Sequence, residues 1–230
     1  MKKAFSLLAV FMVAVMWSAT GFSADKYVSG NIGISWMNDI SRTPTYTYEG
    51  DDYRQSVDTG SGISLNGAFG YDYGDYRIEA ELGYQTNDIE TMTFLRNGDG
   101  ETQEATGDVS VTSLMANAYY DIDLGGNVEF YLTTGIGVAQ IDIDDVAPEY
   151  SENRFFNTSE TAFAYQLGAG LAIPVSDGIM LDARYRYLAT TDFTIGGESP
   201  LVKADYFMAG GENNGNIESH SALLGLRVNL

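Results

Sequence analysis

One stretch, residues 163–188, constrains the fold more than any other part of the chain, and it reads FAYQLGAGLAIPVSDGIMLDARYRYL. Every second side chain is apolar or aromatic as far as Ile173, and the alternation resumes from Ile179 to Tyr187. The positions between them include Gly, Gln, Asp and Arg. A period of two places successive side chains on opposite faces of a β-strand. The stretch therefore predicts a long β-hairpin with one apolar and one polar face, turning at residues 174–178.

The same alternation recurs along the chain and gives eight predicted strands in all. They are expected at residues 26–37, 61–73, 76–85, 109–121, 128–141, 163–173, 179–188 and 216–230. Val109 and Val111 fall on the polar parity of the fourth strand, which leaves its register open. The turns after the second, fourth and sixth strands are short. The other connections are long and polar, at residues 38–60, 88–108, 142–160 and 189–215.

Alternation alone does not say which face points inward, because a soluble lipocalin-type barrel alternates too. Three features favour a membrane barrel with its apolar face outward. The apolar set carries no charge across the central parts of the strands, as a lipid-facing surface requires. The polar set mixes small residues with opposite charges, as a narrow filled interior needs. Tyrosines cluster at the turn ends, where an aromatic girdle would lie: Tyr71, Tyr73, Tyr76 and Tyr120.

These features predict an all-β fold, a transmembrane antiparallel up-and-down β-barrel of eight strands. The alternation of connection lengths predicts short periplasmic turns and four long extracellular loops. The chain ends on its last strand, which can pair with the first and leave no open edge.

Residues 1–23 are typical of an export signal. Lys2 and Lys3 are followed by an apolar run from Leu7 to Trp17, too short for the roughly 20 residues that span a bilayer as a helix. We expect cleavage after Ser23, or alternatively after Ala24. A retained anchor helix is the other interpretation, although no stop-transfer pattern follows. Residues 24–230 would then form a single barrel domain.

Composition excludes some functions. The chain has no Cys, so no disulfide contributes to its stability. Its formal charge of −20 argues against nucleic acid as a partner. The long connections hold most of the acidic residues, which could bind divalent cations or form an anionic contact surface. No Ca²⁺-loop spacing is present, so a solvated acidic rim is favoured, and no metal or other cofactor is predicted.

Four segments carry a resemblance to a known family. They are Asn117–Asp121 (NAYYD), Thr134–Val138 (TGIGV), Tyr165–Gly170 (YQLGAG) and Leu181–Tyr187 (LDARYRY). They resemble the small eight-stranded outer-membrane β-barrels, the opacity-protein and OmpA/OmpX-like group, and the resemblance covers essentially all of residues 24–230. It implies a bacterial outer-membrane location, contact with outer-membrane lipids and lipopolysaccharide, and folding by the barrel-assembly machinery.

The C-terminus departs from the pattern of that family, whose members usually end in Phe. This chain ends in Leu230, but the alternate apolar positions Leu226 and Val228 are intact. We therefore predict that these three residues form the assembly signal.

Two patterns could suggest chemistry, and both are weak. The pairs Gly135-x-Gly137 and Gly168-x-Gly170 lie mid-strand with no helix after them, so they indicate close packing rather than phosphate binding. The lone His220 lies beside two serines on a lipid-facing parity. Some barrels of this family are lipid-modifying enzymes with a Ser–His pair near the outer rim. Here neither neighbouring serine shares the parity of the histidine, which argues against catalysis.

The inward parity of three predicted strands carries seven charged residues: Arg77, Glu79, Glu81, Asp182, Arg184, Arg186 and Arg227. An isolated buried charge is very costly, and an eight-stranded barrel is narrow enough for opposite walls to meet. We therefore predict an ion-pair network between the third and seventh strands, with Arg227 joining from the eighth. The resemblance supports such pairs, since related barrels often close the lumen this way. The alternative is that the groups lie at different heights and bind water or backbone carbonyls.

Taken together, the sequence predicts a non-enzymatic outer-membrane barrel with a plugged or narrow lumen. Its acidic loops would have a structural or adhesive role at the cell surface, with a surface ligand or host cell as a possible partner. The alternative is a small-solute pore, and a lipid-modifying enzyme is a distant third.

Overall fold

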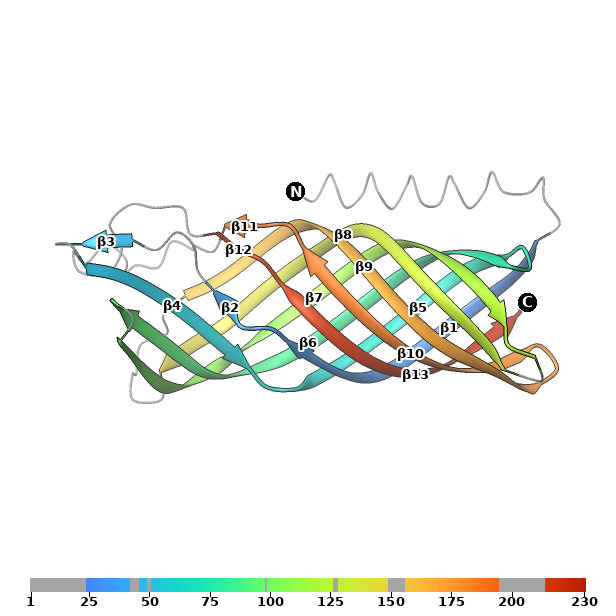
Figure 1. Cartoon of the computed structure of the whole chain (residues 1–230), viewed down its shortest axis with the longest axis horizontal. Coiled ribbons are helices and arrows are strands. Elements are labelled where there is room, and N and C mark those ends of the chain that lie inside the picture. The colour runs from blue at the N-terminus through green and yellow to red at the C-terminus, as the bar shows by residue number, and fades with distance from the viewer. Residues whose placement is uncertain are drawn as a thin grey trace.

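Eight antiparallel strands form a closed ring in the computed structural model, which describes residues 24–41, 46–48, 51–97, 99–125, 128–148, 156–194 and 214–230 (Figure 1). They are β1 (Asp25–Met37), β5 (Gly62–Asp72), β6 (Tyr76–Arg96), β7 (Asp99–Asp123), β8 (Glu129–Pro148), β9 (Phe156–Ser176), β10 (Ile179–Thr190) and β13 (Glu218–Asn229). Each pairs with its neighbours in sequence, and β1 also pairs with β13. The predicted up-and-down barrel is confirmed.

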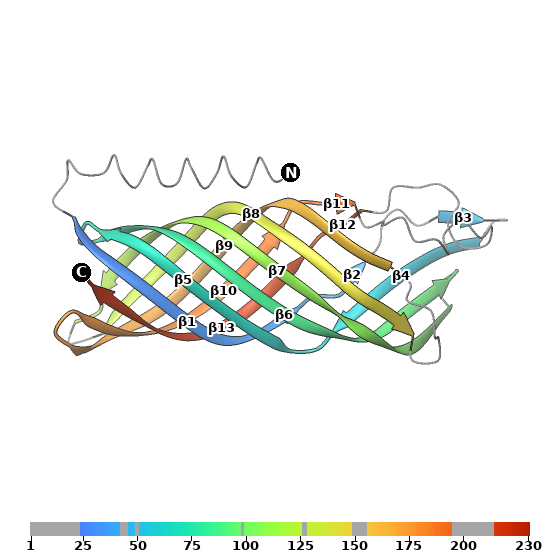
Figure 2. The same cartoon turned by 180° about the vertical axis from the view of Figure 1, so that it is seen from behind.

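One end of the barrel has tight turns, as predicted. Gly74, Gly125 and Gly178 occupy these turns with φ of 96°, 81° and 72°, a conformation that glycine adopts without strain. The carboxylates of Asp72 and Asp123 accept hydrogen bonds from the backbone N–H groups of Gly74 and Gly125, at 2.9 and 2.7 Å. The turns after β5 and β7 are therefore Asx-type turns. Figure 2 shows the three short turns at the same end as the C-terminus.

The opposite end is more ordered than the sequence suggested. The predicted loop at residues 88–108 is wrong, because β6 and β7 continue there as a hairpin to Arg96 and Asp99. Asn97 has φ of 53° and precedes Gly98 in the sequence, and Asn-Gly is the strongest short hairpin signal. The loop predicted at residues 142–160 is longer than the connection in the structure. There β8 runs to Pro148 and β9 begins at Phe156.

The first and last long connections also contain strands. Residues 38–60 hold β2 (Ile40–Ser41), β3 (Tyr46–Tyr48) and β4 (Asp51–Thr59). Strand β4 pairs with β6 between Ile89 and Arg96, at the end with the long connections, which we call the upper end of the barrel. In the connection at residues 189–215, β11 (Phe193–Thr194) pairs with β12 (Asn214–Gly215). The predicted signal, residues 1–23, lies outside the described residues. Within the described part of the chain, no helix has the length and hydropathy to span a bilayer.

The apolar set of each strand faces outward, as predicted. Ile32, Ile136 and Leu224 are each about 60 % exposed at the middle of their strands. The inward set changes character along the barrel. Near the short turns it is polar and charged, whereas near the long connections it is apolar. Val109 and Val111 belong to the inward set and are buried, so the register of the fourth predicted strand is continuous with the rest.

Among the residues that the structure describes, a cluster of 17 buried apolar side chains fills the barrel toward the long connections, and we call it the apolar plug. Its members are Met37, Ile40, Val57, Ile89, Met92, Ala105, Val109, Val111, Met115, Ala139, Ile141, Ile143, Ala162, Ala164, Leu188, Phe193 and Ile217.

Candidate functional site: the closed lumen

All seven charged residues singled out from the sequence lie inside the barrel. Their exposed fractions are 5 % or less. They come from β6, β10 and β13, where the period-two pattern directs them inward.

The β6–β10 contacts centre on Glu81. One carboxylate oxygen lies 2.9 Å from Nη1 of Arg184, and the other lies 3.5 Å from Nη1 of Arg186. Three strands separate β6 from β10 in either direction around the ring. The pair of Glu81 and Arg184 therefore spans the lumen between opposite walls. Nε of Arg184 also lies 3.8 Å from Asp182, whose carboxylate accepts hydrogen bonds from Tyr131.

Glu79 is held differently from the other charges. Its carboxylate accepts hydrogen bonds from four neutral donors, with Tyr119 at 2.7 Å, Tyr27 at 3.1 Å, and Ser29 and Asn117 at 3.3 Å each. Among the described residues, no basic side chain lies within 4 Å of it. Hydrogen bonds therefore replace the ion pair expected for this residue.

Arg227 makes no direct contact with the pairs between β6 and β10, but it is linked to β6 through Glu129, one carboxylate oxygen of which also lies 3.8 Å from Nη2 of Arg77. Nη2 of Arg227 lies 2.8 Å from Glu129 of β8, at the mouth beside the short turns. Arg77 makes a two-pronged contact with Asp121 of β7, at 2.6 and 2.7 Å. The sequence argument missed Asp121 and Glu129 as partners, although both lie on the polar parity of their strands.

Aromatic rings pack around Arg77. Its guanidinium carbon lies 4.4 Å from the ring centroid of Tyr119 and 5.1 Å from that of Tyr131, within cation–π range. Tyr131 in turn packs over Gly170 of the neighbouring strand, where an added Cβ would come within 2.3 Å of the ring. The glycine here provides room for a tyrosine, as the sequence argument expected for the mid-strand glycines.

Arg186 connects the charged layer to the apolar plug. Its guanidinium donates hydrogen bonds to Asn66, Ser64 and Gln85 at 3.1, 3.1 and 3.2 Å. Beyond this polar layer the plug begins. The base of the last long connection closes it, since Phe193 and Ile217 are buried in the plug. The backbone N–H of Ile217 also donates to the hydroxyl of Thr190 at 3.0 Å.

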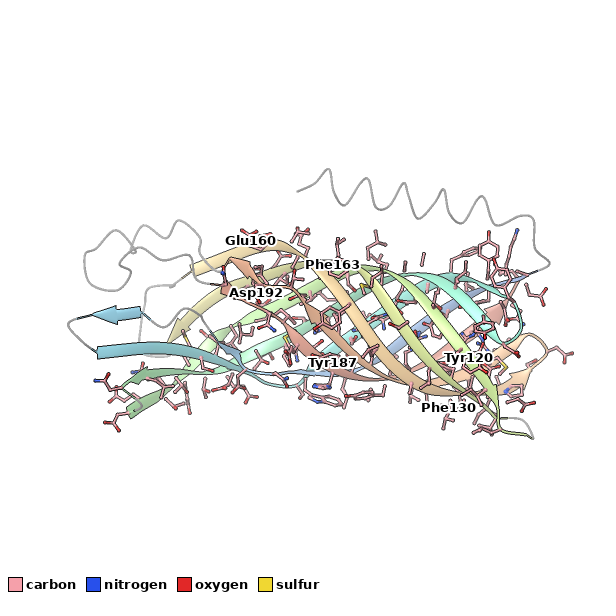
Figure 3. All side chains as sticks on the ribbon, turned by 45° about the horizontal axis from the view of Figure 1, so that its top comes forward. Tyr120, Phe130, Glu160, Phe163, Tyr187 and Asp192 are labelled. Carbon is pink, nitrogen blue, oxygen red and sulfur yellow. The ribbon has the colours of Figure 1, made fainter. Side chains whose placement is uncertain are left out.

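The predicted girdle tyrosines lie at the turn end, but not all are equally exposed. Tyr76 and Tyr120 are 61 % and 45 % exposed, with ring centroids 5.2 Å apart. Tyr71 is buried and packs edge-on against Phe69. Figure 3 shows Tyr120 near that end, and Phe163 toward the end with the long connections.

In the predicted assembly signal, Leu226 and Leu230 are 48 % and 72 % exposed, and Val228 is half-buried on the same parity. The backbone N–H of Leu230 donates to the carbonyl of Lys26 at 2.8 Å. The role of the three residues in assembly stays a prediction.

Within the described ranges, no three His, Cys, Asp or Glu side chains are grouped to hold a metal ion. Nδ1 of His220 lies 2.6 Å from the hydroxyl of Tyr185 on the outer surface. Ser219 and Ser221 are fully buried on the inward parity, and Ser219 donates to Gln85. The histidine and its neighbouring serines therefore lie on opposite faces of the strand.

Comparison with known proteins places this geometry in a family. The family described as "Outer membrane protein beta-barrel domain" matches residues 5–229. Outer membrane protein PagN of Salmonella typhimurium (strain LT2) is 26 % identical over 199 residues, covering 81 % of this chain and 83 % of PagN.

Solved structures that share the fold include NspA and OprG. Neisserial surface protein A (NspA) has a TM-score of 0.50 at 17 % identity and covers 89 % of this chain and 97 % of its own. OprG from Pseudomonas aeruginosa has a TM-score of 0.54 at 14 % identity, covering 91 % of this chain and 98 % of its own. At these identities the likeness is one of fold alone.

Proposed function

Because the chain belongs to the outer membrane protein β-barrel domain family, we propose that it is a non-enzymatic, non-conducting barrel that presents a contact surface outside the cell. Its family gives the location, the bacterial outer membrane. The single observation that best supports a closed lumen is the ion pair of Glu81 and Arg184 between opposite walls, with the apolar plug above it.

Two barriers in series favour a barrel that does not conduct. An ion entering from the short-turn end would first have to displace paired charges, and the pairs of Arg77 with Asp121 and of Arg184 with Glu81 are buried and hydrogen-bonded. It would then meet the apolar plug, where an unpaired charge is very costly and where an apolar constriction excludes water. Removing the ionic barrier alone would leave the second barrier in place.

The projecting hairpin favours a contact function. Above the ring, the upper parts of β6 and β7 pair with each other, and β4 and β3 extend the same sheet. Figure 1 shows this sheet reaching beyond the ends of β8 and β9. Asp99, Glu101 and Glu104 are exposed on it, so the surface offered to a partner is acidic.

Conductance in a planar bilayer tests the closed lumen. We expect the refolded barrel to show no steady openings, and the Arg184→Gln variant to show none either because the apolar plug remains. Stable ohmic conductance of the unaltered barrel would overturn the proposal and favour the small-solute pore.

A shortened hairpin tests the contact surface. Residues 94–101 are replaced by Asn-Gly, so that Thr93 connects to Thr102, its hydrogen-bonded cross-strand partner at 3.0 Å. This design keeps Met92, which is fully buried in the apolar plug. Adhesion is then measured for non-adherent Gram-negative cells that display either form.

We expect the intact barrel to confer adhesion to a cultured cell layer, and the shortened form to lose most of it at equal surface density. As a matched control, the conservative Thr93→Ser variant should adhere like the intact chain. Equal adhesion of the intact and shortened forms would show that the hairpin is not part of the contact surface. Altered lipid A in cells carrying the intact barrel would overturn the non-enzymatic part.

A further inference from the structure

The outer surface carries an aromatic cluster that neither the lumen nor the projecting hairpin explains. His220 of β13 lies between Trp36 of β1 and Tyr187 of β10, its two cross-strand neighbours. The ring centroid of His220 is 6.0 Å from Trp36, at an interplanar angle of 15°, and 5.2 Å from Tyr187. Tyr185 completes the cluster through its 2.6 Å contact with His220. Trp36 and Tyr185 remain 39 % and 47 % exposed.

A carboxylate lies at the upper border of this cluster. Glu218 interacts with the hydroxyl of Tyr187, and it accepts hydrogen bonds from Asn38 at 2.9 Å and Asn216 at 3.3 Å. In the ranges that the structure describes, no basic nitrogen lies within 4 Å of it. The carboxylate is therefore held in place by neutral donors.

The depth of the cluster identifies its surroundings. Just below it, the outward residues are apolar and lipid-exposed, with Ile34 58 % and Leu224 61 % exposed. Just above it, Asn38 and Glu218 are polar. The cluster therefore lies where the hydrocarbon of the outer leaflet meets its headgroups, the usual depth of interfacial aromatics.

We propose that Trp36, Tyr185, Tyr187 and Glu218 form a site for an ammonium group carried on an outer-leaflet lipid headgroup. Aromatic faces attract ammonium ions through their quadrupole, and Trp is the strongest such surface. The negative charge of Glu218 adds direct attraction in a region of lower polarity than bulk water. The lipid anchor follows from the depth, since a bound headgroup would leave its chains against Ile34 and Leu224.

Trp36 allows a direct test. The chain has two tryptophans, Trp17 and Trp36, so in a Trp17→Phe background the fluorescence reports only on the cluster. The refolded barrel in a sugar-based, amine-free detergent is titrated with dihexanoyl phosphatidylethanolamine. Parallel titrations use dihexanoyl phosphatidylglycerol, which has no amine, and free ethanolamine, which has no acyl chains.

We expect a saturable change in Trp36 emission with the ethanolamine lipid and none with the glycerol lipid. Glu218→Gln should weaken the ethanolamine-lipid affinity about tenfold, a loss of the size expected for a partly desolvated cation site. The matched control is Asp142→Asn, which removes an equal charge from the outward parity of β8, away from the cluster.

Three results would overturn the site. Equal responses to the two lipids would show that the amine is not recognised. An unchanged affinity of the Glu218→Gln variant for the ethanolamine lipid would show that this carboxylate is not part of the site. Saturation by free ethanolamine at the same concentration as the lipid would show that the ligand is a soluble amine rather than a headgroup.

Discussion

The two halves of the lumen are built from the same strands but with opposite chemistry. On β8, Tyr131 points inward near the short turns and Leu132 points outward, 48 % exposed. Ten residues further on, Ile141 is the inward residue and Gln140 the exposed outward one. The alternation never changes, yet polar and apolar residues exchange faces. The lower half is polar inside and apolar outside, and the upper half is the reverse.

The difference follows from what surrounds each half. In the membrane the outer face contacts lipid, so polar side chains can be accommodated only inside. Above the membrane the outer face contacts water, and burial of apolar side chains inside becomes the driving force, as in a soluble barrel. The chain therefore joins a membrane barrel to a water-soluble one on continuous strands. The exchange of faces marks the boundary, at the depth of Trp36 and His220.

The largest expected effect concerns the ionic half. Arg184→Gln leaves the buried carboxylate of Glu81 with Arg186, at 3.5 Å, as its one basic partner among the described residues. Removing one partner of a buried ion pair lowers the free energy of unfolding by about 3–5 kcal/mol. Urea unfolding in detergent measures the loss, for Glu81→Gln, Arg184→Gln and both together. We expect the double variant to lose much less than the sum of the single losses.

Arg227→Gln is the comparison for that cycle. Its partner Glu129 has a side chain that is 28 % exposed, so water can replace the lost contact and the cost should be smaller. Strictly additive losses in the cycle would show that Glu81 and Arg184 do not interact, and would weaken the contrast between the two halves.

The apolar half should respond to lost volume rather than lost charge. Ile141→Ala removes three buried carbons from the apolar plug and should cost about 2–5 kcal/mol, because the surroundings cannot collapse fully. Ile136→Ala, on the same strand but 60 % exposed to lipid, should cost less because lipid or detergent fills the space. Equal costs in the same urea experiment would mean that the upper half has no packed core of its own.

The sequence predicts the ring of strands well because a lipid-facing strand cannot carry charge at mid-depth. It predicts the upper half poorly because the rule behind that inference ends where the membrane ends. Val109 and Val111 looked like a register problem, whereas they were the signal that the faces exchange. The Asn97-Gly98 dipeptide likewise marked a hairpin inside a segment that polarity alone indicated as a loop.

For the lumen, parity predicts which side chains point inward but not which of them meet. Strands tilt around the barrel, so residues that are partners across the lumen need not share a position along their strands. Glu129 of β8, which contacts both Arg227 and Arg77, was therefore left out of the predicted network. Glu79 shows a further limit, because hydroxyl and amide donors can hold a carboxylate without any cation.

Glycines on the two faces of the barrel give a smaller, matched test. Gly170 faces inward under Tyr131, and an added methyl group would force the ring to move. We expect Gly170→Ala to cost about 1–3 kcal/mol in urea unfolding, as overpacking usually does. Gly67 faces outward with nothing within 4 Å of an added Cβ, so Gly67→Ala should change stability by less than about 0.5 kcal/mol. A similar cost at both sites would show that the inner face is not tightly packed.

The smallest expected effect lies on the outside of the apolar plug, where Asp39 is exposed beside the buried Ile40. Burial and the neighbouring carboxylate of Asp58, which also accepts a hydrogen bond from Thr91, raise the pKa of Asp39 above its ordinary value. The folded state then binds this proton more tightly than the unfolded state. The resulting stabilisation is complete below the unfolded pKa and is lost as the pH rises through the folded pKa.

Asp39→Asn should therefore stabilise the barrel slightly at pH 7 and leave it unchanged near pH 3. Asp39 is largely exposed, so solvent screening keeps the gain at pH 7 below about 0.5 kcal/mol, and added salt should reduce it further. Urea midpoints at the two pH values, with and without salt, measure the effect. A gain at pH 3 as large as that at pH 7 would show that the carboxylates do not repel each other. The end of the barrel with the long connections would then owe its stability to the apolar plug and not to its surface charges.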